Sequence, residues 1–320
     1  MKSSSSPDIS VVICTCNRAD ELAKTLSSLA EVRIPEGRLA ELILVDNNSK
    51  DTTPEVVGSA ASQLERFTVK PVAEPKQGLS AARNRGLAEA KGAVIIFTDD
   101  DVRLEPDWLE GMSEPILAGK ADALAGGVRI AAHLLRPWMA PQHRAWLAST
   151  ELLDRERPIG MVGANMAFAR RVLDHVPTYD EELGAGSSYG FHEEVLFSRQ
   201  LKKAGFKISP RFDVEVEHHF QEKRLLRSSF LDTAVKKGRS EAYLDYHYDH
   251  KSEEGLRKRH RINTVALRLA QLNPFRKSQE GIGLFEMKAL IRFHHTREWL
   301  SLLGQPRKYE KQGLVKLLQV

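Results

Sequence analysis

The feature that most constrains the fold of this chain is an alternation of short apolar runs with helical patterns in its N-terminal part. The apolar runs are rich in Val, Ile and Leu, which predicts strands buried in a sheet. The intervening segments repeat apolar residues at helical spacing. The predicted order is strand 9–14, helix 21–30, strand 42–45, helix 51–57, strand 67–72, helix 79–90 and strand 93–97. Strands that alternate with helices need crossover connections, so this order predicts an α/β fold with a mostly parallel central sheet.

The alternation weakens beyond Glu110, and the remaining elements are predicted one by one. We expect strands at 123–130, 163–168, 206–208 and 214–216, a helix at 193–204, and a glycine-rich flexible loop at 181–192. Helical patterns dominate from Leu225 onward. The chain is therefore expected to divide into a flexible N-terminus (1–7), an α/β domain (8–221) and a basic, mostly helical C-terminal region (222–320).

Polar clusters follow three of the predicted strands at the points where the strands end. They occupy residues 15–18, 46–49 and 99–101. In parallel sheets, ligands bind beyond the carboxyl ends of the strands, so we expect these clusters to meet in one site. The glycine-rich fingerprints of dinucleotide and P-loop phosphate sites are absent from the sequence.

Three consecutive carboxylates, Asp99, Asp100 and Asp101, form the third cluster. One interpretation is a solvated turn that caps the helix beginning near Trp108. The other is a site for a hard cation, because neighbouring carboxylate oxygens suit Mg²⁺ or Mn²⁺. The charge run alone does not distinguish the two interpretations.

The charge of the chain is distributed unevenly. Residues 222–320 contain 21 Lys and Arg against 11 Asp and Glu, a net charge of +10, so residues 1–221 carry −6 of the total of +4. An excess of positive charge favours an anionic partner, either phospholipid head groups or nucleic acid. We expect the C-terminal helices to pack on the α/β domain with a solvated basic face, and docking on an anionic membrane surface is the functional alternative.

Several features of the sequence bear on location. No apolar run is long enough to span a bilayer, and the N-terminus lacks the apolar core of a signal peptide. Two cysteines, Cys14 and Cys16, are too few for a disulfide framework. A cytoplasmic protein is expected, with peripheral attachment to the inner face of the membrane as an addition.

Six motifs, in order and at characteristic spacing, resemble those of the family 2 glycosyltransferases. The resemblance covers roughly residues 8–220 and implies the GT-A fold. The segments that carry it are Val11–Arg18, Val45–Ser49, Gly78–Gly86, Phe97–Asp101 with Pro106–Leu109, Gly163–Phe168, and Glu193-Glu194 with Arg199–Gly205.

The resemblance implies roles for the residues that would bind a nucleotide. Asp46 would accept hydrogen bonds from the base, usually uracil, and Thr15, Asn17 and Arg18 would line the nucleoside pocket. Arg83 would approach the diphosphate, where a fixed cation offsets negative charge.

The aspartates match the D-x-D element of the family. Asp101 would bind Mn²⁺ or Mg²⁺, and Asp99 or Asp100 would contact the ribose or a metal-bound water. His218 falls where related enzymes place a histidine near the metal, with His219 as the adjacent alternative. The metal would stabilise the leaving nucleoside diphosphate as a Lewis acid.

The resemblance also implies inversion by direct displacement, which needs one general base on the acceptor hydroxyl. The family usually has Glu-Asp at this helix start, whereas this chain has Glu193-Glu194. Glu194 matches the position of the base, and Glu193 is the alternative.

Residues that would contact the transferred sugar or the acceptor are less well marked. Gly163 and Asn165 are expected near the sugar. Trp138, Trp146 and the loop 184–190 are candidates for acceptor binding, because aromatic faces suit sugar rings.

The predicted function is that of an inverting, metal-dependent glycosyltransferase in cell-surface polysaccharide or glycolipid synthesis. The expected donor is a nucleotide-sugar, with UDP as the expected nucleotide, and the expected acceptor is a glycan or a lipid-linked hydroxyl. A nucleotidyltransferase would need a basic glycine-rich loop after the first strand, where residues 15–18 stand instead. A non-catalytic nucleotide-sugar-binding or membrane-surface scaffold remains the alternative, and no nucleic-acid partner is expected.

Overall fold

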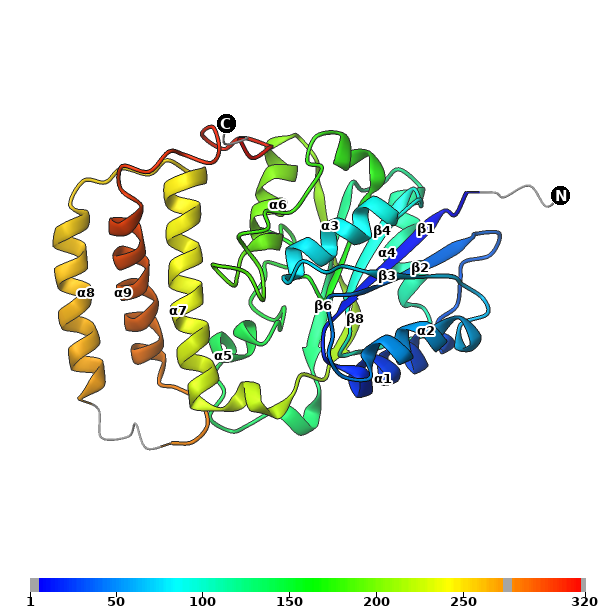
Figure 1. The fold of residues 1–320 in the computed structure, drawn as a ribbon, viewed down its shortest axis with the longest axis horizontal. Helices are drawn as coiled ribbons and strands as arrows, with labels where there is room; N and C mark the ends of the chain where they lie inside the picture. The colour runs from blue at the N-terminus through cyan, green and yellow to red at the C-terminus, as the bar shows by residue number, and fades with distance from the viewer. Residues whose placement is uncertain (1–5, 273–277, 318–320) are drawn as a thin grey trace.

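The computed structural model describes residues 6–272 and 278–317. An α/β domain with a single mixed sheet lies beside a layer of three C-terminal helices (Figure 1). The predicted flexible segment 1–7 falls largely outside the described residues. None of the described helices is both long and apolar enough to cross a bilayer.

The eight strands of the sheet follow the order β3-β2-β1-β4-β7-β6-β8-β5. Their bounds are β1 Ile9–Thr15, β2 Ala40–Asp46, β3 Thr68–Ala73, β4 Val94–Asp99, β5 Val102–Leu104, β6 Ala123–Ile130, β7 Asn165–Ala169 and β8 Ile208–His218. Four of the seven strand pairings are parallel, and β7 is antiparallel to both its neighbours. The mixed α/β sheet confirms the predicted fold class, and β3, which contains Pro71, is an edge strand of the sheet.

The helices of the α/β domain connect and cover these strands. They are α1 Ala19–Glu31, α2 Thr53–Gln63, α3 Leu79–Glu89, α4 Trp108–Leu117, α5 Pro141–Trp146 and α6 Glu193–Lys203. Helix α3 packs on β1 and β2, and α4 packs on β4, β6, β7 and β8. The central strands are buried along nearly their whole length, which explains why they read as continuous apolar runs in the sequence.

The register of the parallel strands brings the predicted polar clusters together. Thr15 at the end of β1 pairs with Asp46 at the end of β2, and Cys14 pairs with Asp99 at the end of β4. All three clusters therefore lie together at the carboxyl ends of the parallel strands, as the alternation of strands and helices predicts.

One predicted pair of strands was wrong. Segments 206–208 and 214–216 are not separate strands, because a single strand, β8, runs from Ile208 to His218. Its middle holds Pro210, Arg211 and Asp213, which interrupt the apolar pattern, and the register against β6 shifts there. The loop predicted at 181–192 contains no helix or strand.

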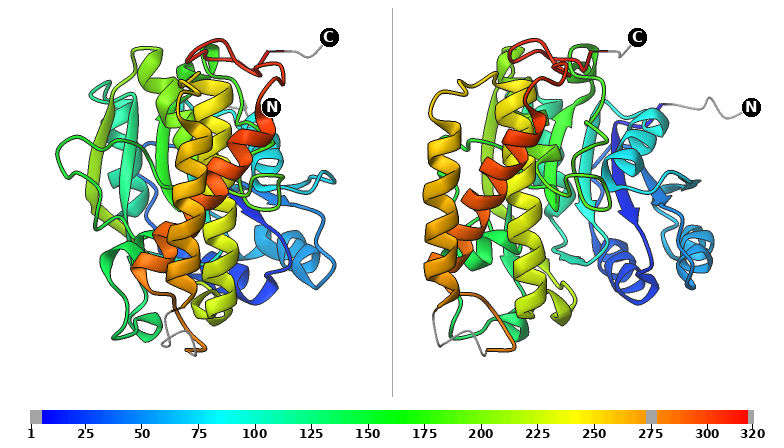
Figure 2. Two further views of the ribbon diagram at one scale, coloured as in Figure 1. Left: turned by 90° about the vertical axis from the view of Figure 1, so that its left-hand side faces the viewer. Right: turned by 60° about the vertical axis from the view of Figure 1, so that its left-hand side comes forward.

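The C-terminal region consists mainly of helices α7 Arg227–Tyr243, α8 Leu256–Gln271 and α9 Leu284–Leu302. Helix α9 packs against both α7 and α8, and the views of Figures 1 and 2 agree that it lies between them. Helix α7 is the member of this layer nearest the α/β domain (Figure 1).

Candidate active site

A cavity of about 530 Å³ opens at the carboxyl ends of β1 and β4. Its walls come from both parts of the chain: the strand ends and the start of α6 on one side, and α7 with the segment before it on the other. Ten predicted site residues line it: Thr15, Arg18, Arg83, Asp99, Asp100, Asp101, Gly163, Glu193, Glu194 and His218.

At one end of the cavity, Asp99, Asp101 and His218 form a group that could hold a metal ion. One ligand atom from each lies within 4.8 Å of the others. The His218 Nδ1 lies 2.9 Å from the carbonyl oxygen of Leu147, which can only accept, so Nδ1 must carry the proton. The other ring nitrogen, Nε2, faces Asp101 Oδ1 at 3.2 Å.

Two potential metal ligands, His218 Nε2 and Asp101 Oδ1, therefore lie close together in a buried place. Asp101 Oδ1 is buried and accepts no hydrogen bond from the described residues. Carboxylate oxygens and imidazole nitrogens are both ligands of divalent metals. The residues present therefore fit a divalent ion.

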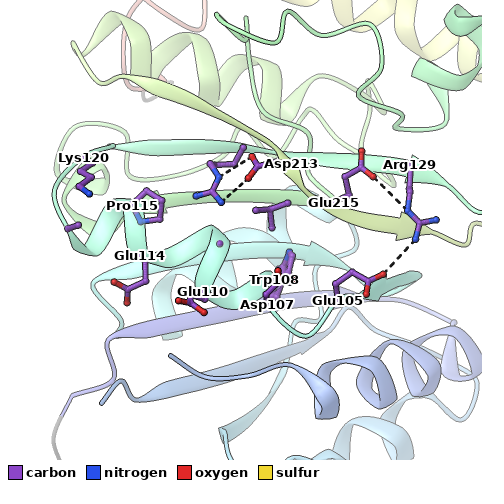
Figure 3. Close-up of a pocket in the computed structure, with 14 residues that line it drawn as sticks. Glu105, Asp107, Trp108, Glu110, Glu114, Pro115, Lys120, Arg129, Asp213 and Glu215 are labelled. Carbon is purple, nitrogen blue, oxygen red and sulfur yellow. Dashed lines mark hydrogen bonds and ion pairs between the residues drawn. The ribbon is translucent and has the colours of Figure 1, made fainter. Parts of the chain in front are cut away.

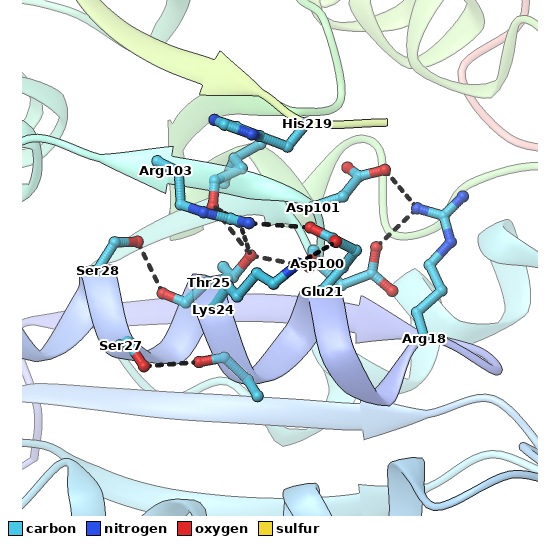
Figure 4. Close-up of polar contacts among 12 residues, drawn as sticks. Arg18, Glu21, Lys24, Thr25, Ser27, Ser28, Asp100, Asp101, Arg103 and His219 are labelled. Atoms are coloured by element: carbon cyan, nitrogen blue, oxygen red, sulfur yellow. Dashed lines mark hydrogen bonds and ion pairs between the residues drawn. The ribbon is translucent and has the colours of Figure 1, made fainter. Parts of the chain in front are cut away.

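Arg18 compensates part of the negative charge of the aspartates (Figure 4). Its Nη1 lies 2.9 Å from Asp100 Oδ1 and 2.5 Å from Asp101 Oδ2. Burial raises the pKa of Asp100 to about 7, although Arg18 opposes the shift. Burial also opposes the ionisation of Asp101, but His218 and Arg18 together hold the pKa of that carboxyl below its usual range. Asp101 is thus ionised at neutral pH and ready to bind a cation.

The remaining histidine, His219, turns to other partners. Its backbone N–H donates to the carbonyl oxygen of Asp101 at 2.7 Å, and its ring contacts Glu217 Oε1 at 2.6 Å. Of the two adjacent histidines, the geometry favours His218 for the metal group.

At the other end of the cavity, Arg83 links the metal group to the acidic start of α6. Its Nη1 donates to Glu193 Oε1 at 2.7 Å, and its Nη2 lies 4.0 Å from Asp99 Oδ1. The guanidinium is buried near the rings of Phe97 and Tyr179. Arg83 is therefore held inside the wall rather than extended into the cavity as a free cation.

Gly163 makes room for that guanidinium. A Cβ added there would lie 2.1 Å from Arg83 Nη2, which is far inside van der Waals contact. This position lies on the wall of the cavity, and a side chain larger than hydrogen would push Arg83 from its place.

The two glutamates differ in their surroundings. Glu193 is buried and paired with Arg83, whereas Glu194 is half-buried and forms no ion pair among the described residues. Burial and the neighbouring Glu193 raise the pKa of Glu194 to about 8, against the opposing effect of Arg83. Glu194 is the more suitable proton acceptor, since a general base works best with a pKa near the operating pH.

The predicted base-binding residues Asp46 and Asn17 lie beside the cavity, outside its lining. Asp46 Oδ1 accepts the backbone N–H of Ser49 at 3.1 Å. Asn17 accepts the backbone N–H of Lys50 through its side chain at 2.7 Å, and its backbone N–H donates to Ser49 Oγ at 2.9 Å. Both residues shape the loops that border the cavity next to Thr15.

The structure places two predicted sugar or acceptor residues away from the cavity lining. Asn165 is fully buried in β7, where its amide donates to the carbonyl oxygens of Gly127 and Val214 and accepts the indole N–H of Trp108 at 3.0 Å. Trp138 packs edge-on against His143 and Phe230, and its indole N–H donates to Glu280. Their hydrogen-bonding groups are engaged within the protein, so these positions differ from the expectation.

The C-terminal region supplies cavity residues that sequence reasoning missed. Helix α7 contributes Ser229, Asp232, Thr233 and Lys236. These polar residues recur at helical spacing, a signal that usually marks a solvated face. Arg224, in the turn before α7, also lines the cavity and forms no ion pair with the described residues.

Hydrogen bonds to other parts of the chain hold the loop at 181–192, both at Asp180 directly before it and within it. The carboxylate of Asp180 accepts hydrogen bonds from Tyr243 at 2.6 Å, Tyr309 at 2.8 Å and Lys316 at 2.7 Å. Within the loop, the carbonyl oxygen of Ala185 accepts the N–H of Leu79 at 2.8 Å. The C-terminal region thus also positions this wall of the cavity.

A larger hollow of about 770 Å³ lies elsewhere, between α4 and strands β6 and β8 (Figure 3). Five of its nine charged lining residues pair with one another: Arg211 with Asp213 at 3.0 Å, and Arg129 with Glu105 and Glu215 at 3.8 Å each. It contains none of the predicted site residues, so the smaller cavity is the candidate active site.

Comparisons with known proteins agree with this geometry. The family model for glycosyl transferase family 2 matches residues 10–176, just over half of the chain. The succinoglycan biosynthesis protein ExoO of Rhizobium meliloti is 32% identical over 245 residues, which are 72% of this chain and 66% of ExoO.

Two solved structures share the fold. The mannosyltransferase PcManGT from Pyrobaculum calidifontis, in complex with GDP-Man and Mn²⁺, matches 94% of this chain and 71% of its own, with a TM-score of 0.55 and 16% identity. S. aureus TarS 1-349 in complex with UDP-GlcNAc matches 95% of this chain and 93% of its own, with a TM-score of 0.50 and 17% identity. The first curated relatives are matched over only about 40% of their own length.

Proposed function

The chain belongs to the family 2 glycosyltransferases, and we propose that it transfers a sugar from a nucleotide-sugar to a hydroxyl group with inversion at the anomeric carbon. The observation that carries this proposal is the cavity that joins a metal-binding group, Asp99, Asp101 and His218, to a carboxylate with a raised pKa, Glu194. A single displacement requires a group that stabilises the leaving diphosphate, here at the metal end of the cavity, and a base that removes the proton of the acceptor, here Glu194 at the other end.

Glu194 would take the proton from the acceptor hydroxyl as its oxygen attacks the anomeric carbon. The bond between that carbon and the diphosphate oxygen breaks in the same step, and the nucleoside diphosphate leaves with the bonding electrons. Arg83 would hold Glu193 in place beside Glu194, where Glu193 helps to raise the pKa of the base. Arg83 thus acts as a positioning residue rather than as the diphosphate contact.

Mn²⁺ or Mg²⁺ held by Asp99, Asp101 and His218 would neutralise charge on the departing diphosphate. Arg224 is the cation in this cavity that lacks a carboxylate partner among the described residues, so we assign the second contact with the diphosphate to it. Arg18 would pair with Asp100 and orient it toward the ribose, while Thr15, Asn17 and Asp46 would surround the nucleoside.

We propose UDP as the nucleotide and a glycan or lipid-linked hydroxyl as the acceptor. The names of related proteins, which include a succinoglycan biosynthesis protein and a cholesterol galactosyltransferase, support acceptors of this class. The reaction would take place at the cytoplasmic side of a membrane, with Gly163 and the loop 184–190 next to the transferred sugar.

Calorimetric titration of UDP, GDP and dTDP, with and without Mn²⁺, tests the donor site. We expect metal-dependent binding of UDP that disappears in Asp101→Asn and persists in Asp107→Asn, an exposed aspartate outside the cavity. A preference for GDP or dTDP would replace the donor assignment and leave the site in place. Failure of the folded protein to bind any of the three would favour the scaffold alternative.

Turnover is tested by the release of nucleoside diphosphate from the sugar nucleotide that binds. Glu194→Gln should keep donor binding and lose turnover, whereas Glu110→Gln, an exposed glutamate in the first turn of α4, should keep both. Full turnover by Glu194→Gln would contradict the assignment of the base.

A further inference from the structure

Helix α8 is the outermost helix of the C-terminal layer (Figures 1 and 2). It packs on α9 through the buried side chains of Leu256, Leu267 and Ala270. Polar contacts support the same face, including the bond from the Asn263 amide to the carbonyl oxygen of Arg292 at 3.0 Å. One face of α8 is therefore satisfied by the protein itself.

The opposite face of α8 carries a second apolar stripe that nothing in the described structure covers. Ile262, Val265 and Leu269 are 58%, 56% and 58% exposed, and Leu272, directly after the helix, is 77% exposed. Their spacing of three, four and three residues places them on one side of the helix, about 180° from the packed side chains. Scattered surface leucines are ordinary, but a continuous stripe on an outermost helix indicates a partner.

Positive charge surrounds this stripe. Helix α8 contains no Asp or Glu, and its five basic residues are all exposed: Arg257, Lys258, Arg259, Arg261 and Arg268. Three of them, Lys258, Arg261 and Arg268, share or border the side occupied by the stripe and form no ion pair with the described residues. The exposed side of α8 therefore combines an apolar stripe with positive charge that is unpaired within the described structure.

We infer that α8 docks on the surface of an anionic bilayer, with its axis in the membrane plane. The stripe would enter the boundary between head groups and acyl chains, and the basic side chains would contact lipid phosphates, as in other basic amphipathic helices. The biological reason for such docking rests on the proposed function, since a lipid-linked acceptor is presented at a membrane surface. The structural observations that support the docking come from α8 alone.

Charge complementarity distinguishes the bilayer from other occupants of this face. A second copy of the chain would bring five further positive charges against the five of α8, which opposes association. Nucleic acid would satisfy the charges but would leave the apolar centre of the face against phosphates and water. An anionic bilayer satisfies both the stripe and its basic border.

Co-sedimentation with vesicles tests the inference. The complete protein should sediment with vesicles of phosphatidylglycerol mixed with phosphatidylcholine and remain in solution with phosphatidylcholine alone. Lys258→Ser/Arg261→Ser/Arg268→Ser should weaken binding about 100-fold, because each basic residue near an anionic surface contributes on the order of a fivefold gain in affinity. Val265→Ser/Leu269→Ser should also weaken binding to the anionic vesicles, because it removes two exposed apolar side chains of the stripe.

Matched controls separate position from composition. Lys91→Ser/Lys203→Ser/Lys207→Ser removes the same charge from exposed sites on the α/β domain. Leu152→Ser/Ile159→Ser removes exposed apolar side chains there. Both controls should bind anionic vesicles as the unaltered protein does.

Several results would overturn the inference. These are the absence of vesicle binding by the unaltered protein, an equal loss of binding in the controls, dissociation of an oligomer by Val265→Ser/Leu269→Ser, or tighter binding to duplex RNA or DNA than to anionic vesicles. Cooperative thermal unfolding of the same α8 variants shows that they are folded, and nucleoside diphosphate binding in the cavity is measured separately. Because the two binding events are measured separately, the loss of one proposal leaves the other standing.

Discussion

Gly163 offers the sharpest test of the candidate site, because its space is defined by three distances to one side chain. A Cβ at this position would lie 2.1 Å from Arg83 Nη2, 3.0 Å from Cζ and 3.4 Å from Nη1. An ordinary carbon–nitrogen contact is about 3.4 Å or more, so in Gly163→Ala the terminal nitrogen must move by roughly 1.3 Å.

Arg83 has little freedom to make that movement. Its guanidinium is enclosed near the rings of Phe97 and Tyr179, and its Nη1 is bonded to Glu193 at 2.7 Å. We expect overpacking to cost about 1–3 kcal/mol and to lower Tm by roughly 2–6 °C. The release of nucleoside diphosphate should fall by about 100-fold, since a displacement near 1 Å beside the reacting groups has effects of that size.

Thermal unfolding and turnover of Gly163→Ala, with Gly58→Ala as control, measure both effects. A Cβ at Gly58, in helix α2, meets no atom within 4 Å. A double-mutant cycle with Arg83→Lys assigns the cause, because lysine lacks the nitrogen that the new Cβ meets. In that background the cost of Gly163→Ala should fall to less than half. Unchanged stability and turnover in Gly163→Ala, or an unchanged cost in the cycle, would refute the reasoning.

Three further predictions follow from the same contacts. Turnover should rise with pH toward an apparent pKa near 8, set by Glu194; because the folded state favours the protonated carboxyl, its contribution to stability falls as pH rises from about 4.5 to about 8, and Glu194→Gln should flatten that part of a stability–pH curve. Arg224→Gln should raise the KM for the donor at least about tenfold through the loss of a charged contact, whereas the exposed neighbour Lys223→Gln should not; equal KM values would remove Arg224 from the diphosphate site. Asn165→Ala breaks three buried hydrogen bonds, including that of Trp108, and should lower the free energy of unfolding by about 3 kcal/mol while nucleoside diphosphate binding persists; lost turnover with unchanged stability would restore the predicted sugar contact.

The central strands could be predicted from the sequence because burial on both faces leaves a continuous apolar run. The runs 9–14, 42–45 and 93–97 fall within β1, within β2 and largely within β4. Strand β8 is partly exposed and carries polar residues in its middle, so its pattern gave two short pieces instead of one strand. The apolar pattern of the sequence predicts a strand well where both faces of the sheet are buried, and less well toward the exposed edge of the sheet.

The metal end of the site could be anticipated from the family resemblance, because the run of aspartates alone fits a solvated turn equally well. The role of Asn165 was harder to predict. An asparagine whose amide donates to buried carbonyl groups cannot be distinguished in the sequence from one that binds a sugar. The contribution of α7 could not be seen at all, because Ser229, Asp232, Thr233 and Lys236 read as an ordinary solvated face until the helix is packed over the cavity. Tertiary placement, rather than residue type, decides such positions.

The order of the helices in the C-terminal layer sets a reach for the substrate. Helix α7 borders the cavity, α9 lies next, and α8 is outermost (Figure 1). Packed helix axes are about 8–10 Å apart, so two such steps separate the outer helix from the one that borders the cavity by roughly 20 Å. With α8 lying on a bilayer, a lipid-linked acceptor would meet α7 roughly that distance above the membrane surface. The layer would then set the height at which such an acceptor has to present its hydroxyl to the cavity.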